Sequence, residues 1–407
     1  MGAHSGRGIK GLNSFCENLP QFSQNPVDAG FVQDPYPAYD RMRAAGPLVF
    51  WQEFNMACAV SYAAANAILR DRRFGRVPLE ARATPDHLAP FYAVEAHSML
   101  ELEPPRHTRL RSLVLRAFTT RRIAALGPEI AALCDDLIAR APDGAFDLIA
   151  HYAQPLPITI IARLLGVPEA MAPDLLRWSH AMVVMYQAGR SRADEDRAVA
   201  ASRDFVAFLR SYIDERRTDP RDDLITHLIA AEEDGQTLST DEMISTCILL
   251  LNAGHEATVH SIGNAVKTLL ESGDYAKTPI TENLVDECLR FDPPLHLFTR
   301  WAYEDIDVMG RTIPKGAQIA CLLGAANRCP RHWDMPDAFT PTRSPKPHLA
   351  FGAGLHFCLG APLARLELLH ALARLAAARP HLQLTEPPLY ADIYHFHGLN
   401  RLMVAGK

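Results

Sequence analysis

A single cysteine near the C-terminal end of the chain lies in a loop that is rich in glycine. The loop reads Phe351-Gly-Ala-Gly-Leu-His-Phe-Cys-Leu-Gly360, and a helical pattern follows it over residues 361–378. Glycine lets a backbone adopt left-handed angles and approach a flat ligand closely. The first N–H groups of the following helix favour a thiolate over a thiol. Cys358 is therefore a candidate metal ligand, although an isolated cysteine is more often a buried, unreactive side chain.

Two pairs of charged side chains have helical spacing. Glu287 and Arg290 are three residues apart, and His107 and Arg111 are four apart, so each pair shares one side of a helix. Most pairs of this kind are solvated and contribute little to stability. The first pair stands just before Phe291-Asp-Pro-Pro294, which ends its helix, and this position favours a buried structural role.

The cysteine loop resembles the haem-binding loop of the cytochrome P450 family, whose pattern is Phe-Gly-x-Gly-x-His-x-Cys-x-Gly. Every fixed position of that pattern is present: Phe351, Gly352, Gly354, His356, Cys358 and Gly360. The match continues into the helix as in soluble bacterial members of the family. The resemblance implies haem b as the cofactor and Cys358 as the iron ligand, because a cysteine thiolate is the ligand that P450 proteins use to favour O–O cleavage.

The resemblance also assigns the residues around the haem. The two haem propionates need cationic or hydrogen-bonding partners. Four residues are expected there: His107, Arg111, Arg300 and His356. Glu287 and Arg290 resemble the family's Glu-x-x-Arg motif, and Arg343 matches the third member of that buried network. The network is expected to hold the core around the haem and to take no part in the chemistry.

On the opposite haem face, a long expected helix contains Ala253-Gly-His-Glu-Ala-Thr258. It resembles the family's Ala/Gly-Gly-x-Asp/Glu-Thr motif, in which the glycine admits O2 and the acid and alcohol relay protons. Ala253, Gly254 and Glu256 fill their places, but Ala257 stands where the family has threonine. Thr258 follows one residue later, which turns its side chain by about 100° from the face that Ala257 occupies.

Three accounts of this alanine remain open. A local π-bulge would re-aim Thr258 toward the site. A substrate hydroxyl, a substrate carboxylate or an ordered water would replace the missing alcohol, with Glu256 still linked to solvent. An enzyme that uses peroxide, or that couples phenols or indoles, would not need the usual proton delivery. We favour delivery that is assisted by substrate or water.

The rest of the chain is typical of one mainly α-helical domain with small β-sheets, as in the P450 fold. We expect an N-terminal extension over residues 1–32 and the haem domain over residues 33–407. Helical patterns cover residues 61–71, 124–140, 149–165, 169–186, 194–217, 240–271 and 361–378. Strand patterns cover residues 47–51, 56–60, 306–313 and 317–323. Residues 324–350 are expected to be ordered coil, and the short helix that many family members have near residues 271–279 is expected to be truncated.

Composition limits the class of protein. The 407 residues are 48% hydrophobic and 22% charged, with a net charge of −6 and no basic run, so we expect no nucleic-acid partner. The sequence contains no stretch of about 18 consecutive apolar residues, so we expect no membrane span. The cysteines have no paired spacing, which favours a reducing cytoplasmic location. We expect a monomer.

The resemblance implies that several segments wall a substrate pocket. The side chains expected there are Met182, Val183, Val184, Met185, Tyr186, Leu295, His296, Leu297, Phe298 and Phe396. They suit a small apolar or aromatic molecule, and His296 would orient a polar group of it or lie on the surface. No flavin or nicotinamide fingerprint is present, so electrons are expected from separate proteins, and the resemblance to the family implies a ferredoxin and a ferredoxin reductase. Three arginines are candidates for docking that partner: Arg109, Arg116 and Arg365.

The leading hypothesis is therefore a P450 monooxygenase that inserts one oxygen atom into its substrate. A haem-thiolate oxidase or peroxygenase that couples or rearranges its substrate is the second enzyme class. A non-catalytic haem sensor is a third hypothesis, which the retained acid at Glu256 disfavours.

Overall fold

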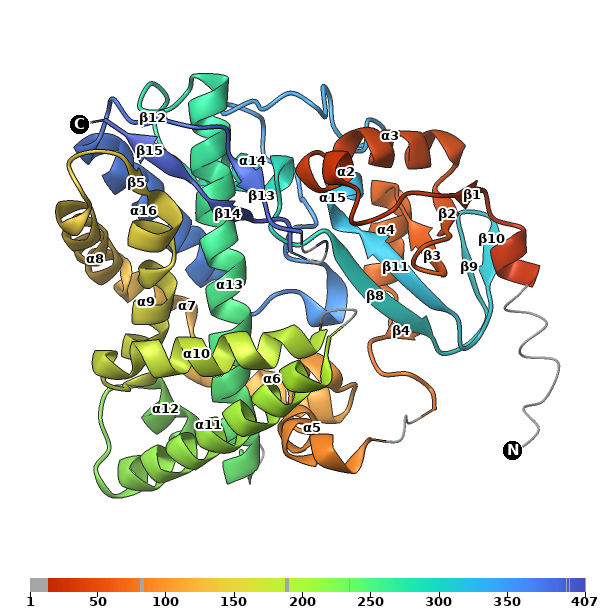
Figure 1. Cartoon of the computed structure of the whole chain (residues 1–407). Coiled ribbons are helices and arrows are strands. Elements are labelled where there is room, and N and C mark those ends of the chain that lie inside the picture. The colour runs from red at the N-terminus through yellow and green to blue at the C-terminus, as the bar shows by residue number, and fades with distance from the viewer. Residues whose placement is uncertain are drawn as a thin grey trace.

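One long helix, α13 (Thr240–Ser272), runs through the middle of the molecule (Figure 1). Its first turn is closed by Ser239, whose hydroxyl accepts the N–H of Glu242 while the Glu242 carboxylate accepts the N–H of Ser239. Its other end is closed by Gly273 in the left-handed conformation, with φ of 75°. The computed structural model describes residues 14–80, 84–186, 190–233, 235–392, 394 and 396–406.

Helices pack around α13 and bury most of its length. Those before it are α5 (Ala89–Glu95), α6 (Arg106–Ala117), α7 (Thr120–Ala125), α8 (Gly127–Arg140), α9 (Pro155–Leu165), α10 (Ala172–Val183), α11 (Arg192–Thr218) and α12 (Leu224–Ala230). Those after it are α14 (Glu282–Phe291) and α16 (Ala361–Ala378), whereas α15 (Leu323–Asn327) packs with the β-sheet part of the fold. A π-helical turn at Ile149–Ala153 leads into α9, and 3₁₀ turns flank α10. The helices expected from the sequence are present with boundaries close to those predicted.

A six-stranded sheet forms the second part of the fold, on the right of Figure 1. Its order is β1 (Gln21–Phe22), β2 (Leu48–Trp51), β3 (Met56–Ala59), β11 (Gln318–Leu322), β8 (Leu297–Ala302) and β4 (Phe74–Gly75). The pairs β2–β3 and β11–β8 are antiparallel, whereas β3–β11 is parallel. Helices α2 (Ala29–Gln33), α3 (Tyr36–Ala45) and α4 (Tyr62–Arg70) pack against it.

The N-terminal extension expected over residues 1–32 falls partly outside the described residues, which begin at Ser14. Its described part contributes β1 to the large sheet and buries Leu19 and Phe31. Residues 14–32 therefore pack with the rest of the fold.

The described residues also form four small sheets. They pair β9 (Ile306–Val308) with β10 (Arg311–Ile313), β13 (Leu389–Tyr390) with β14 (Leu399–Arg401), β6 (Glu232–Glu233) with β7 (Gln236–Thr237), and β15 (Met403–Ala405) with both β5 (Phe146–Asp147) and β12 (Gln383–Leu384).

Two local predictions differ from the structure. The segment 306–313 was expected as one strand pattern but folds as the β9–β10 hairpin, because Met309 and Gly310 both have positive φ and reverse the chain. The coil expected over residues 324–350 begins within α15. The truncation near residues 271–279 is present, since all residues from 273 to 281 are described and form turns without a helix.

Candidate active site

The cysteine loop is held open by two glycines in the left-handed region. Gly352 has φ of 68° and Gly354 has φ of 71°. A Cβ atom on Gly354 would lie 2.2 Å from the Leu69 carbonyl oxygen, so the loop can pass α4 only with glycine at this position. The Cys358 N–H donates to the Phe351 carbonyl over 3.0 Å, which closes the loop just before α16.

Opposing effects act on the Cys358 thiol. Burial raises its pKa, whereas hydrogen bonds from the backbone of Gly360 and Ala361 and the positive charges of Arg111 and Arg365 lower it. Burial prevails, and the pKa lies above its ordinary value. The start of α16 thus directs amide groups at the sulfur, as the sequence predicted, and these amides favour a thiolate that binds a cation.

A group of basic side chains surrounds the same loop. His107 is buried, its ring centroid lies 4.3 Å from that of His356, and its Nδ1 atom has no hydrogen-bond partner. His356 Nε2 lies 3.2 Å from both oxygens of Glu103. Arg111 donates to the Phe357 carbonyl over 2.7 Å. The structure therefore brings three of the four predicted propionate-binding residues around the cysteine loop.

The fourth residue, Arg300, is a buried cation without an ion-pair partner among the described residues. It is 2% exposed and donates to the Thr299 carbonyl, and among the described carboxylates Glu103 acts on it through its charge but forms no ion pair with it. Burial, with Arg76 nearby, lowers its pKa to about 10. A buried cation of this kind needs an anion. The carboxylate-bearing edge of a haem would supply that anion. The same edge would also give a hydrogen-bond partner to the unpartnered Nδ1 atom of His107.

Glu103 is a residue that the sequence reasoning missed. It accepts hydrogen bonds from His356 and from the Arg76 backbone N–H, and these contacts lower its pKa although burial alone would raise it. The sequence signal that could have indicated its role is its position four residues before His107. Spacing in a proline-containing segment does not show, however, that it faces His356.

The central stretch of α13 has accessible backbone and side-chain atoms although the helix lies inside the molecule (Figure 1). Ala253 is exposed, and Gly254 and Ala257 are partly exposed. Cys358 is also accessible, despite the protein atoms crowded around it. Small, uncovered residues on α13 and an uncovered thiol on the cysteine loop are what a flat cofactor between them would require.

Glu256 and Thr258 differ in the state of their polar atoms. Glu256 is largely enclosed, its Oε2 atom has no partner, and burial raises its pKa to about 7. The Thr258 hydroxyl donates to the Gly254 carbonyl over 2.9 Å within its own helix. α13 is α-helical from Thr240 to Ser272 and contains no π-bulge. The account in which such a bulge re-aims Thr258 is therefore wrong.

Gly254 also has a packing role. A Cβ atom at this position would lie 2.8 Å from Ile161 Cδ1 of α9, so glycine lets α9 approach α13 closely. His255 lies on the buried side of α13, with its ring 5.8 Å from that of His180, and burial lowers its pKa to about 3.

The predicted structural network is assembled in full. Glu287 accepts from Arg290 Nε over 2.7 Å and Nη2 over 2.8 Å, and from Arg343 Nε over 3.0 and 3.1 Å. Arg290 also donates to the carbonyls of Asn327, Pro336 and Ala338. Glu287 and Arg290 are 3% and 1% exposed, so this network ties α14 to the coil that precedes the cysteine loop.

The residues expected to wall the substrate pocket have mixed placements. Met182, Val183 and Met185 are buried in the helical core, and Leu295 forms a β-bridge with Phe396. His296 is fully buried, with its Nδ1 2.8 Å from the Tyr39 hydroxyl, so a surface position is excluded. Parts of the pocket segments, namely residues 81–83, 187–189, 393 and 395, lie outside the described residues.

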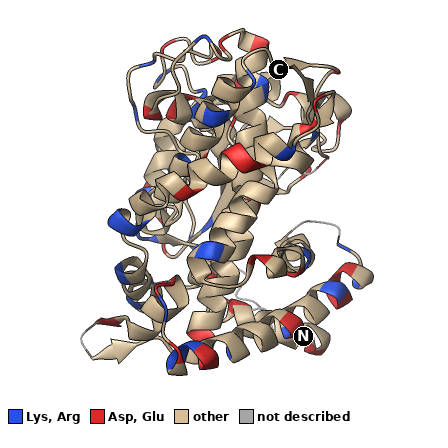
Figure 2. Ribbon diagram, turned by 90° about the vertical axis from the view of Figure 1, so that its left-hand side faces the viewer, with Lys and Arg blue, Asp and Glu red and all other residues tan. Residues whose placement is uncertain are grey.

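None of the three candidate docking arginines is free, since Arg116 has an interaction partner and the other two are held in ion pairs. Arg109 pairs with Glu242, and Arg365 pairs with Asp286 over 2.7 Å and lies 4.6 Å from the Phe351 ring. Figure 2 shows basic and acidic residues interspersed along the helices on the face that it presents.

Comparison with known proteins supports the reading of the loop. A family model described as Cytochrome P450 matches residues 265–376. The chain is 38% identical over 382 residues to cytochrome P450 monooxygenase PikC of Streptomyces venezuelae, covering 91% of this chain and 89% of that protein. The chain belongs to the cytochrome P450 family. It is a P450 monooxygenase, an oxidoreductase whose cofactor is haem b.

Two further similarities extend over most of the P450 chain. It is 37% identical over 389 residues to vitamin D(3) 25-hydroxylase of Pseudonocardia autotrophica, covering 92% of this chain and 94% of that one. The structure is similar, with a TM-score of 0.88 and 34% identity, to P450BioI in complex with an acyl carrier protein ligated to hexadec-9Z-enoic acid, covering 93% and 100% of the two chains. Among the described helices, none has the length and hydropathy needed to cross a membrane.

Proposed function

We propose that this P450 inserts one oxygen atom into an apolar or aromatic molecule, with Cys358 as the iron ligand and with a proton path that begins at Glu256. Bound haem supplies the iron at which O2 is activated. His107, Arg111, Arg300 and His356 would hold the propionates, and the residues of α13 would handle O2 and protons. The burial of Arg300, which forms no ion pair with a described residue and whose pKa is lowered by burial, supports the first assignment.

The proposal about proton delivery rests on the polar side chains in the middle of α13. Glu256 is an enclosed carboxyl group with a pKa of about 7, so it can take up and release a proton near neutral pH. Ala257 has no hydroxyl, and the two alcohols of α13 next to it are both committed to backbone carbonyls, Thr258 to that of Gly254 and Ser261 to that of Ala257. A water or a polar group of the substrate therefore has to bridge Glu256 to the reacting oxygen.

The substrate proposal rests on the residues that flank the site and on the relatives. Phe298, Leu295 and Phe396 offer apolar and aromatic contacts near the cysteine loop and α13, since Phe298 approaches Gly352 and Phe396 lies 5.8 Å from the His260 ring. Relatives named as a vitamin D(3) hydroxylase and as P450BioI with an acyl chain favour a largely hydrocarbon substrate. A polar group on that substrate would occupy the space beside Ala257.

We further propose that electrons come from a separate ferredoxin and its reductase. Leu115 on α6 and Phe357 in the cysteine loop are exposed apolar side chains on elements that Arg111 joins. An exposed apolar pair near the thiolate loop suits a protein that docks briefly to pass an electron. Arg109 and Arg365 contribute less free charge than the sequence suggested, because both are paired.

Reconstitution with a ferredoxin and ferredoxin reductase, compared with peroxide alone, tests the proposal. A panel of hydroxylated and non-hydroxylated apolar substrates is incubated, and product is measured against NADPH consumed. We expect oxygenated product in the full system and the higher coupling with substrates that carry a polar group. Turnover by peroxide alone, with coupled or rearranged products, would instead favour an oxidase or peroxygenase. Ala257→Thr is the matched variant, and a strong rise in its coupling would refute delivery by substrate or water.

A further inference from the structure

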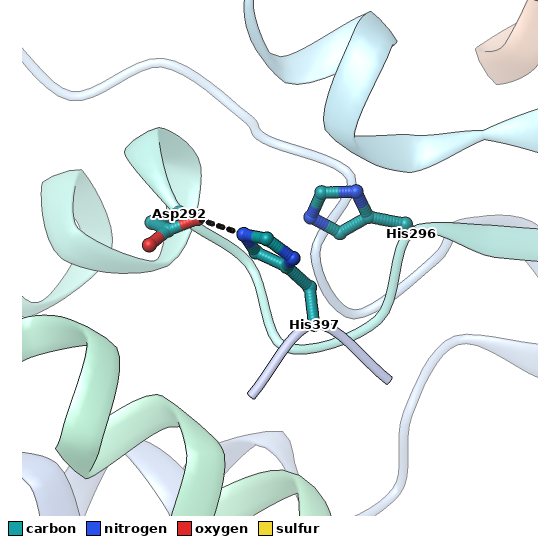
Figure 3. A group of neighbouring side chains, drawn as sticks. All are labelled: Asp292, His296 and His397. Carbon is teal, nitrogen blue, oxygen red and sulfur yellow. Dashed lines mark ion pairs between the residues drawn. The ribbon is translucent and has the colours of Figure 1, made fainter. Parts of the chain in front are cut away.

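Three buried side chains from separate parts of the chain meet in the interior (Figure 3). Asp292 follows α14, His296 precedes β8, and His397 lies in the hairpin between β13 and β14. They are 4%, 0% and 7% exposed. One carboxylate oxygen and one nitrogen of each imidazole all lie within 4.8 Å of one another. Two imidazoles and a carboxylate form a donor set that divalent transition metals bind.

His296 contributes a buried nitrogen that has no partner. Its Nδ1 lies 2.8 Å from the Tyr39 hydroxyl, which is 2.8 Å from the Tyr394 hydroxyl. Its Nε2 makes no hydrogen bond in the described structure, although the Pro293 carbonyl lies beside the ring. An unsatisfied buried nitrogen is costly. The contact with Tyr39 orients the ring in the way that an outer partner orients a metal-binding histidine.

Asp292 is a buried carboxylate that no described lysine or arginine pairs with directly. Its Oδ1 accepts from the Tyr36 hydroxyl over 2.7 Å, its Oδ2 accepts from the Tyr390 hydroxyl, and its ion-pair partner is His397. The two cations nearby have carboxylates of their own. Lys267 pairs with Glu271, and Arg328, which lies over the Tyr36 ring, pairs with Asp337. A bound cation would compensate the charge of Asp292.

The distances suit a small ion. Ligand atoms about 2.0–2.1 Å from a tetrahedral zinc ion lie roughly 3.3–3.4 Å from each other. Asp292 Oδ1 and His397 Nε2 are 3.4 Å apart. All three ligand atoms lie within 4.8 Å of one another, so each separation is at most about 1.5 Å longer than the one expected around zinc.

We propose that Asp292, His296 and His397 bind one divalent zinc-type ion. A water molecule completes the tetrahedron. The ion joins α14 and β8 to the C-terminal hairpin, next to the bridge between Leu295 and Phe396 and the hydrogen bond from His397 N–H to the Pro294 carbonyl. This site is a structural clamp, and the inference does not rest on the proposed oxygenation.

The test uses the untagged, haem-loaded, full-length protein. It is dialysed against a chelator, incubated with zinc chloride, passed through a desalting column and analysed by mass spectrometry for zinc and iron. We expect about one zinc per chain, and a rise in Tm of about 3 °C when free zinc is a hundred times Kd. The CO difference spectrum, recorded in parallel, verifies that the haem is still bound.

Two variants make the test specific. His397→Gln and His296→Gln each remove one ligand and are expected to weaken zinc binding by at least about tenfold. His381→Gln changes an exposed histidine elsewhere and is expected to leave binding unchanged. If the His296 variant does not fold, comparing zinc binding by the His397 variant and by the wild-type protein still tests the proposal. A wild-type zinc content no higher than that of His397→Gln, or equal binding by all variants, would overturn the proposal.

Discussion

Replacing Glu287 by glutamine tests the buried network beneath the cysteine loop. Glu287 accepts hydrogen bonds from Arg290, from Arg343 and from the Thr340 N–H over 2.8 Å. Glutamine keeps one acceptor but turns an NH2 group toward guanidinium donors. Two cations would then be left without a counter-charge in a region where Glu287 and Arg290 are almost fully buried.

The expected loss of stability follows from that burial. Removing one partner of a buried ion pair typically costs about 3–5 kcal/mol. An unfolding entropy of about 2.1 cal/mol/K per residue amounts to about 0.85 kcal/mol/K for this chain. A cost of about 4 kcal/mol therefore predicts a fall in Tm of about 5 °C.

Asp174→Asn is the matched control for this experiment. Asp174 and Arg177 have the same spacing of three residues and a distance of 2.7 Å, but both side chains are about half exposed. Its loss should cost under about 0.5 kcal/mol. Urea unfolding and thermal melts of the haem-loaded proteins measure both variants. A Glu287→Gln cost no larger than that of the control would refute the buried-network interpretation.

Three further outcomes follow from the site. Glu256→Gln should lower turnover about a hundredfold. Because burial raises the pKa of Glu256 to about 7, wild-type turnover that is limited by proton delivery should fall as the pH rises above that value. The variant should show no such pH dependence. Thr258→Val should leave turnover within about threefold, since its hydroxyl already bonds the Gly254 carbonyl; a loss as large as that of Glu256→Gln would contradict this. Gly354→Ala should displace the cysteine loop and weaken the thiolate CO spectrum, whereas Gly316→Ala, also at positive φ but with no atom within 4 Å, should retain it.

The sequence predicted those features whose signal is local. The cysteine loop, the long helix expected over residues 240–271 and the Glu287–Arg290 pair are contiguous in the chain, and the structure has each of them. The β9–β10 hairpin was missed because Gly310 alone within a strand pattern also fits a bulge, and a methionine at φ of 51° carries no turn signal.

Long-range contacts limited the rest. Arg109 and Arg365 were predicted to be available for docking a partner protein. Their ion-pair partners, Glu242 and Asp286, are distant in sequence and could not be identified from spacing. His296 read as a residue that orients substrate or lies on the surface. Its burial against Tyr39 depends on the docking of α3, which spacing along the chain does not reveal.

A crystal structure of the haem-loaded protein with its substrate bound tests the central claim most directly. The account predicts an ordered water or a polar substrate atom beside Ala257, within hydrogen-bonding reach of Glu256, with Thr258 still donating to the Gly254 carbonyl. A Thr258 hydroxyl that has left that carbonyl and itself occupies the position beside Ala257 would contradict it.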